Sequence, residues 1–421
     1  MTDDDYFDDA MVGVLDDDPA DGGLTLTPEA FQAGFGEELH STLDLATWRD
    51  QPDFAEELAR IEAQVREAVG LETHFHERFR HEVFPLIAHS AAAPPGAGVY
   101  DADAALLNEV HDDLLVRGAV EACDGTNHVH DTLPLTVYQV GVSLVSYRGD
   151  RGTWQQRLFR RDLRQGGGDP AAEAMALLEA RGKRGALNHA GPRDLLSELA
   201  RRSLMAYAER AILLRKSEAI WRVGHGNPVP HELLTGAGCG ELTVAALKVL
   251  RELIEGHKKF VFVASEPGDR LLLTLGQALR PLQYAIVGTL PDRIGHLADT
   301  VYFAPRATGD EWDGEPLTPV GWVRRFMRDV APKVVYGFYR ATPLAPGHLF
   351  FAHVDHADEA AHVALADSLM QEHRGFPMLI TLADRVCQAV FGGGYLDRMT
   401  EAAYAAAGVP WRYQSERATR G

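Results

Sequence analysis

The chain has 421 residues, of which 46% are hydrophobic and 24% charged, and its formal net charge is −20. This composition is that of a soluble globular protein, and the length predicts two to three domain-sized units. The acidic balance excludes a protein that coats nucleic acid with a general basic surface. It is compatible with a nuclease that has a local basic channel.

The sequence predicts a cytoplasmic protein that does not enter a membrane. It has no run of about 20 apolar residues, and its first residues are acidic, unlike a secretory signal. Cys123, Cys239 and Cys387 lie far apart without a Cys-x-x-Cys motif, so we expect neither a disulfide framework nor a structural zinc site. Cys123 could act as a nucleophile, but a buried strand cysteine is the simpler interpretation.

Residues 1–25 form an acidic arm that contains Asp3-Asp4-Asp5 and Asp16-Asp17-Asp18. We expect a disordered, solvated tail, although such an arm could mimic DNA or contact a basic partner.

Residues 26–117 predict an N-terminal helical region. Thr27 is a capping residue, and Pro28 suits the first turn of a helix. Apolar residues then recur at the spacing of a helix face, at Phe54, Leu58, Ile61, Val65 and Val69. The histidines and glutamate that follow predict either a solvated helix face or a metal site, and they are His74, His76, Glu77 and His81.

Residues 119–147 predict a β-hairpin with Asp124-Gly125 at its tip. Glycine tolerates positive φ, and Asp-Gly is one of the commonest hairpin turn pairs. The residues from Leu133 to Tyr147 favour a strand. A carboxylate at a strand end suits a Mg²⁺ or Mn²⁺ site, and a plain turn is the alternative.

Residues 148–164 form the strongest basic segment of the chain. Six arginines are interleaved there with Trp154 and Phe159. This pattern suits contacts with a nucleic-acid backbone and stacking on bases. A solvated loop and helix is the alternative.

The rest of the chain predicts a mixed sheet flanked by helices. A long amphipathic helix over 194–218 is followed by strands that alternate with helices, which indicates an α/β or α+β fold. No Gly-x-Gly-x-x-Gly opens a helix after a strand, and no P-loop occurs, so nucleotide binding by those routes is not predicted.

Four short motifs occur in a characteristic order along the chain. They are Asp124-Gly-Thr126, Tyr207-Ala-Glu-Arg210, Trp221-Arg-Val-Gly-His-Gly-Asn-Pro-Val-Pro230 and Gly375-Phe-Pro377 leading to Ala383-Asp384. In this order they resemble the NurA family of DNA-end-processing nucleases, which work with HerA-type hexameric ATPases. The resemblance implies that residues 118–421 form a nuclease domain with an RNase H-like, PIWI-like mixed sheet, extended at its N-terminus by helices.

The resemblance also implies the site. Asp124 matches the first metal ligand of the family, and Glu209, with Glu198 as second choice, matches the glutamate of the following helix. His225 stands where the family has an aspartate, and Asp384 stands where it has a histidine. Asp124, Glu209 and Asp384 are therefore the expected catalytic residues, and Asp124, Glu209 and His225 the expected ligands of Mn²⁺ or Mg²⁺. The residues expected to grip the DNA backbone are Arg160, Arg161 and Arg164.

The function implied is metal-dependent hydrolysis of DNA in end processing, repair or defence, with a HerA-like ATPase and a homodimer as expected assemblies. The departure at His225 favours an alternative, a catalytically degenerate subunit that docks on the ATPase. An unrelated α/β hydrolase or metal enzyme is a third interpretation, but the chain has no Gly-x-Ser-x-Gly or His-Glu-x-x-His motif.

Overall fold

The structure is a computed structural model, and it describes residues 27–48, 54–132, 135–161, 198–265, 270–299 and 309–409, together with 171, 172, 175, 301 and 303. The predictions for the acidic arm and for Arg164 lie outside these residues. The chain divides into two compact units, one of residues 1–84 and 266–278 and one of residues 85–265 and 279–421. In the described residues, no helix is long and apolar enough to cross a membrane.

The first unit is helical in its described residues, whereas the predicted helical region 26–117 also contains a strand over Gly98–Asp101. Thr27 caps its first helix by accepting a hydrogen bond from the backbone N–H of Ala30 at 3.1 Å. The predicted apolar stripe lies on one long helix, none of whose residues is buried. The helices of this unit are α2 (Pro28–Phe35), α3 (Leu39–Leu43), α4 (Phe54–Arg78) and α12 (Arg270–Ala278), with a short 3-10 segment (Leu45–Thr47) and a π-helical segment (Phe79–Val83).

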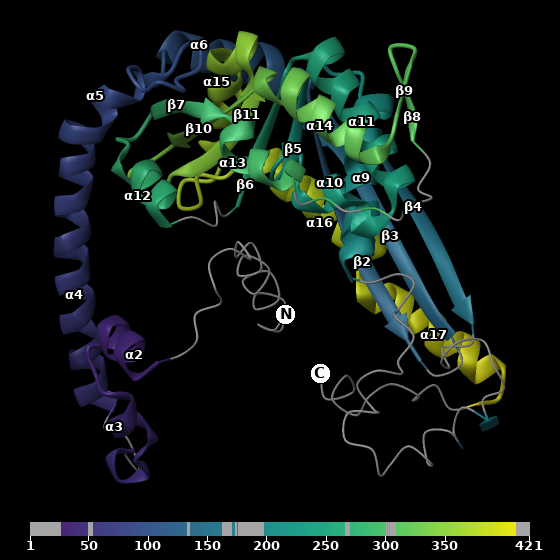
Figure 1. The fold of residues 1–421 in the computed structure, drawn as a ribbon, viewed down its shortest axis with the longest axis horizontal. Helices are drawn as coiled ribbons and strands as arrows, with labels where there is room; N and C mark the ends of the chain where they lie inside the picture. Colours follow the sequence, from purple (N-terminus) through teal and green to yellow (C-terminus); the bar gives the residue numbers. More distant parts are fainter. Residues whose placement is uncertain are drawn as a thin grey trace. The chain divides into compact units, whose positions relative to one another are not determined.

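The second unit is built on a sheet of nine strands in the order β1-β7-β10-β11-β6-β5-β2-β3-β4 (Figure 1). The pairs β2–β5 and β5–β6 are parallel, and the other pairs are antiparallel. The strands are β1 (Gly98–Asp101), β2 (Val120–Asp131), β3 (Leu135–Ser146), β4 (Gly149–Arg161), β5 (Trp221–His225), β6 (Phe260–Ala264), β7 (Gln283–Thr289), β10 (Val334–Arg340) and β11 (His348–His353), and a separate hairpin is made by β8 (Asp310–Trp312) and β9 (Glu315–Leu317).

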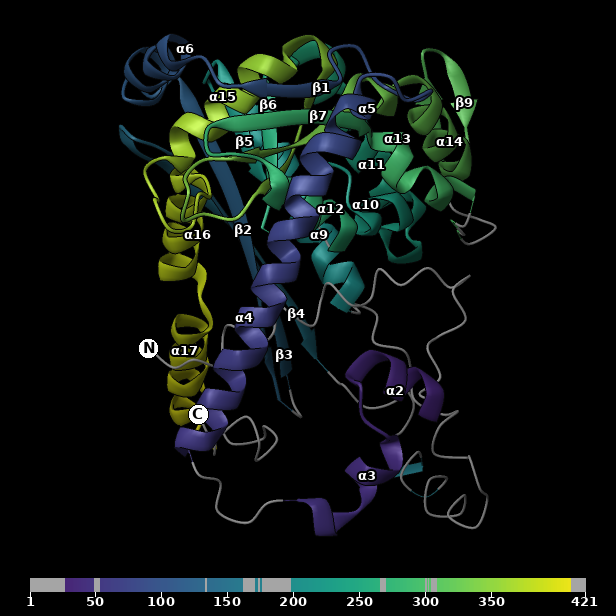
Figure 2. The same ribbon diagram turned by 90° about the vertical axis from the view of Figure 1, so that its left-hand side faces the viewer.

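Helices cover both faces of this sheet. Side chains of β2 and β3 contact α9 on one face and α16 on the other, and α17 continues along β2 after α16 (Figure 2). The helices are α5 (Phe84–Ile87), α6 (Ala104–Glu109), α9 (Glu198–Lys216), α10 (His231–Thr235), α11 (Gly240–Arg251), α13 (Leu290–Ile294), α14 (Pro319–Asp329), α15 (Ala357–Ser368), α16 (Met378–Phe391) and α17 (Gly393–Ala406).

The core of the sheet is formed by its central strands. Phe260, Phe262 and Phe350 are at most 1% exposed, and the strand β6 is buried along its whole length. Such a continuously apolar strand is expected where helices cover both faces of a sheet. Strands β4-β3-β2-β5-β6, three antiparallel and then two parallel, have the arrangement of an RNase H-like fold. The predicted fold class, a mixed sheet flanked by helices, is confirmed.

The predicted hairpin tip at Asp124-Gly125 is wrong. Both residues lie inside β2 and pair with Ser143 and Val142 of β3. Gly125 does not have positive φ, and the pairing continues to Asp131. The Asp-Gly pair is a local turn signal, but here the whole segment 120–131 pairs as one strand, and the reason for the glycine is tertiary, as described below.

Candidate active site

Asp124 lies on the face of the sheet that α16 covers. Its partner across the strands, Ser143, donates a hydrogen bond to the carbonyl of Ala383 in α16 at 2.5 Å. The preceding residue, Cys123, points to the opposite face and its thiol donates to the carbonyl of Glu209 in α9 at 3.5 Å. Asp124 is thus held inside a strand between two helical layers, and it is only 5% exposed.

Gly125 allows α9 to approach β2 closely. A Cβ atom at Gly125 would lie 2.7 Å from Oε1 of Glu209 and 3.0 Å from Cγ of Met205. Real Cβ atoms do not approach so closely, so a side chain at residue 125 would force the side chains of Glu209 and Met205, or α9 itself, to shift. Gly125 therefore places the carboxylate of Glu209, a residue that is 9% exposed, beside the backbone that carries Asp124.

His225 is the last residue of β5 and lies next to Asp124. The parallel pairing of β2 with β5 ends at Cys123 and Gly224, so the next residue of each strand falls at the same end of the pair. Nδ1 of His225 lies 3.4 Å from Oδ1 of Asp124. The side chain of His225 is 35% exposed, which makes it the most accessible of the three.

Arg210 holds these elements together, a role that the sequence did not predict. Its guanidinium forms an ion pair with Glu209. It also donates to the carbonyls of Asn227 at 2.7 Å, Pro228 at 3.3 Å and His225 at 3.4 Å. Arg210 thereby ties α9 to the loop that follows β5. The only sequence signal was its position directly after Glu209 in the motif.

The site is a compact set of opposite charges. Burial raises the pKa of Glu209 to about 7; Arg210 opposes this rise, and the charge of Asp124 adds to it. Burial opposes the charged form of His225, but the carboxylate of Asp124 and its hydrogen bond outweigh burial and raise the pKa of His225 to about 9. At neutral pH the imidazolium therefore neutralises Asp124, and Glu209 is poised to exchange a proton.

The donor chemistry of these side chains suits one divalent cation. Two carboxylates and one imidazole are ligands that Mn²⁺ accepts, whereas Mg²⁺ favours oxygen alone. Among the described residues, no group of three His, Cys, Asp or Glu side chains is already arranged to hold an ion. Each carboxylate lies beside a cationic side chain, Glu209 beside Arg210 and Asp124 beside His225.

The other predicted site residues in the described part of the chain lie on α16, β4 and α9. Asp384 lies on α16, the helix that covers Asp124, but its carboxylate accepts a hydrogen bond from Gln388 at 3.0 Å. The backbone of Arg160 and Arg161 belongs to β4, which replaces the alternative of a loop and helix. The positions of their side chains, and that of Glu198 at the start of α9, lie outside the described part of the chain.

Two simpler interpretations of the sequence hold. Cys123 is a buried strand cysteine, and burial raises the pKa of its thiol, so it is not an activated nucleophile. On α4, His74 and Glu77 are exposed and His76 contacts Glu72 at 3.0 Å, as expected of a solvated helix face.

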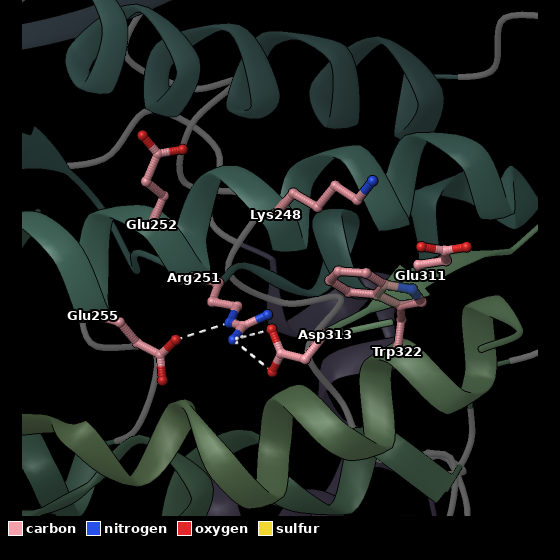
Figure 3. A pocket seen from close by; sticks show the side chains of 7 residues that line it. All are labelled: Lys248, Arg251, Glu252, Glu255, Glu311, Asp313 and Trp322. Atoms are coloured by element: carbon pink, nitrogen blue, oxygen red, sulfur yellow. Dashed lines mark hydrogen bonds and ion pairs between the residues drawn. The ribbon is translucent and has the colours of Figure 1, made fainter. Parts of the chain in front are cut away.

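A separate shallow cavity of about 340 Å³ lies over α11 (Figure 3). The guanidinium of Arg251 lies in this cavity and forms ion pairs with Glu255 at 2.8 Å and with Asp313 at 2.9 Å. None of the predicted site residues lines it, and its central guanidinium is already bound by carboxylates. The residues that line it are Lys248, Arg251, Glu252, Glu255, Glu311, Asp313 and Trp322.

Comparison with known proteins finds similarity in structure. No family model and no curated protein sequence matches the chain. The NurA nuclease from Sulfolobus solfataricus is similar over 85% of this chain and 98% of its own, with 8% identity and a TM-score of 0.44. A NurA structure with manganese is similar over 67% of this chain and 91% of its own, with 9% identity and a TM-score of 0.37.

Endonuclease V from Ciona intestinalis, in complex with DNA, is similar over 64% of this chain and 84% of its own, with 12% identity and a TM-score of 0.25. The family named by the motif order is thus also the family of the first two structures. At these identities and TM-scores the similarity concerns the fold, and no activity, metal or partner is transferred by it.

Proposed function

We propose that this chain is a divalent-metal-dependent nuclease that hydrolyses phosphodiester bonds in DNA. The observation that supports the proposal is the position of two side chains around β2: His225 lies 3.4 Å from Asp124, and the carboxylate of Glu209 lies beside the next residue, Gly125. Asp124, Glu209 and His225 are the three positions that the motif order singles out as metal ligands. Arg210, which fixes α9 to the loop after β5, gives the site the rigid support that such chemistry needs.

Asp124, Glu209 and His225 would hold the cation, with Mn²⁺ preferred because of the imidazole. When bound, such an ion activates water and stabilises the leaving oxygen. His225 must first release the proton that Asp124 stabilises, and Arg210 keeps Glu209 oriented. Asp384, on the helix above Asp124, is the remaining candidate to complete the site.

A second copy of the chain and a HerA-type ATPase are the proposed partners. The apolar residues on α4 support the first, because a row of large apolar side chains in water usually marks an interaction surface. Their exposed fractions lie between 54% and 84%, and they are Phe54, Leu58, Ile61, Val65 and Val69. The ATPase rests on the sequence resemblance alone. Co-purification from the native host, followed by mass measurement, tests both.

The alternative is a non-catalytic subunit of a DNA-translocase complex. One observation favours it: Arg210 and His225 neutralise both carboxylates without any metal. In a site that has lost its catalytic function, such ion pairs would stabilise the fold, because buried carboxylates need cationic partners.

A nuclease assay separates the two functions. The wild-type protein is incubated with linear and with circular DNA in Mn²⁺, Mg²⁺ or EDTA, with and without the ATPase. We expect cleavage in Mn²⁺ and none in EDTA, and Asp124→Asn should abolish it. If neither the wild type nor His225→Asp cleaves DNA under any condition, the non-catalytic subunit is the correct interpretation.

A further inference from the structure

The site opens toward Arg374, an exposed residue before α16. Asp124 and Glu209 are almost fully buried, so we infer that the site opens at His225, the most exposed of its residues. The ring of Phe376 packs edge-on against the ring of His225, with centroids 5.7 Å apart and an interplanar angle of 76°. The guanidinium carbon of Arg374 lies 5.9 Å from the centroid of Phe376. The ring of Phe376 therefore lies between Arg374 and His225, at the open side of the site.

The backbone around Arg374 is firmly held. A ring N–H of the buried His348 donates to the carbonyl of Arg374 at 2.7 Å. The N–H of Gly375 donates to the carbonyl of Gln371 at 2.7 Å, and the amide of Gln371 donates to the carbonyl of Phe376 at 2.9 Å. Gly375 has φ of 57°, where a side chain would be strained. A fixed backbone with an exposed side chain is the arrangement of a pre-oriented ligand contact.

The side chain of Arg374 is exposed to solvent. In the part of the chain that the structure describes, Arg374 makes no ion pair, whereas Arg210, Arg251 and Arg325 are all paired with carboxylates. An exposed arginine that makes no ion pair with the described residues is available to an anionic ligand from outside the chain. The planar guanidinium matches the oxygens of a phosphate.

We propose that Arg374 binds a backbone phosphate of the DNA strand that enters the site past His225, next to the phosphodiester that is cleaved. This inference rests on the proposed function, since it assigns the substrate contact of the same site. Arg374 is a binding residue and not a catalytic one, because Phe376 separates it from the metal-ligating side chains. Loss of Arg374 therefore weakens the binding of DNA and leaves the chemical step intact.

The test compares Arg374→Ala, Arg374→Lys and the matched control Arg328→Ala, which removes an exposed arginine of α14 that is paired with Asp329. DNA affinity is measured by fluorescence anisotropy with a single-stranded oligonucleotide at several salt concentrations, in Ca²⁺ to prevent cleavage. For Arg374→Ala we expect a Kd raised about tenfold, a salt slope smaller by about one, and a higher KM with an unchanged kcat.

Arg374→Lys keeps the positive charge and should retain the salt slope, with an affinity between those of the wild type and Arg374→Ala. The inference is overturned if Arg374→Ala and Arg328→Ala have the same Kd and salt slope while the wild type binds and cleaves DNA. It is also overturned if kcat falls and KM does not change. A wild type that neither binds nor cleaves DNA refutes the proposed function itself, and with it the role of Arg374.

Discussion

Replacing Gly125 tests the central geometrical feature of the site, the close approach of α9 to β2. In Gly125→Ala, the new methyl group would lie 2.7 Å from Oε1 of Glu209 and 3.0 Å from Cγ of Met205. Because α9 also packs on β3 and α11, it cannot move away freely. Overpacking of this kind costs about 1–3 kcal/mol of unfolding free energy.

The same displacement moves Glu209 relative to Asp124. Mn²⁺ affinity and the cleavage rate should therefore fall by more than the loss of folding stability alone would cause. Unfolding is followed by circular dichroism in urea, and metal binding by calorimetry. Gly295→Ala is the matched control, because its methyl group would meet only Cβ of Pro291 at 3.9 Å. We expect the control to behave as the wild type.

Gly125→Asn separates this account from the turn that the sequence predicted. At a turn with positive φ, asparagine is tolerated better than alanine. Inside β2, the larger asparagine collides more severely with Glu209, so it should be the less stable of the two variants. The reasoning is refuted if Gly125→Ala matches the wild type in stability and Mn²⁺ affinity, or if Gly125→Asn is more stable than Gly125→Ala.

Four further variants test the charges and the surface. The pKa of His225 in the folded state is about 9, above the ordinary 6.5. Protonated His225 therefore stabilises the metal-free protein fully below pH 6.5, and this stabilisation is lost as the pH rises through 9. In His225→Gln, the unfolding free energy measured in urea should fall less steeply over this range. Mn²⁺ affinity should rise between pH 7 and 9 as the imidazolium loses its proton, and calorimetry of His225→Asp should show tighter Mg²⁺ binding with a weaker pH dependence. Asp384→Asn should reduce the cleavage rate less than Asp124→Asn, since the carboxylate of Asp384 accepts a hydrogen bond from Gln388. Ile61→Lys combined with Val65→Lys should convert a dimer to a monomer in light scattering, and an unchanged mass would exclude the α4 face as the contact between copies.

The sequence predicted features that depend on local chemistry. The Thr27 cap and the helical stripe of α4 were both predicted, because capping and apolar periodicity act over a few residues. The apolar periodicity of α4 did not predict that its apolar side chains are exposed. Burial depends on what packs against a helix, and periodicity does not contain that information.

The candidate site was predicted in part. His225 contacts Asp124, and Glu209 lies beside Gly125, the next residue of β2. Gly125 was assigned to a turn because its real role, the approach of α9 from about 80 residues away, is not a local signal. Arg210 was missed for a similar reason. Its partners are backbone carbonyls of residues 225–228, and no side-chain pattern marks a carbonyl acceptor.

Binding of Mn²⁺ to the metal-free protein tests the central claim most directly. Electron paramagnetic resonance counts the bound ions without any need for catalysis, and it detects a nitrogen ligand through its coupling to the metal. We expect one ion per chain with a coupled histidine nitrogen, no bound ion in Asp124→Asn, and an ion without nitrogen coupling in His225→Asp. A wild type that binds no Mn²⁺, or an Asp124→Asn variant that binds it as well as the wild type, would contradict the proposed site.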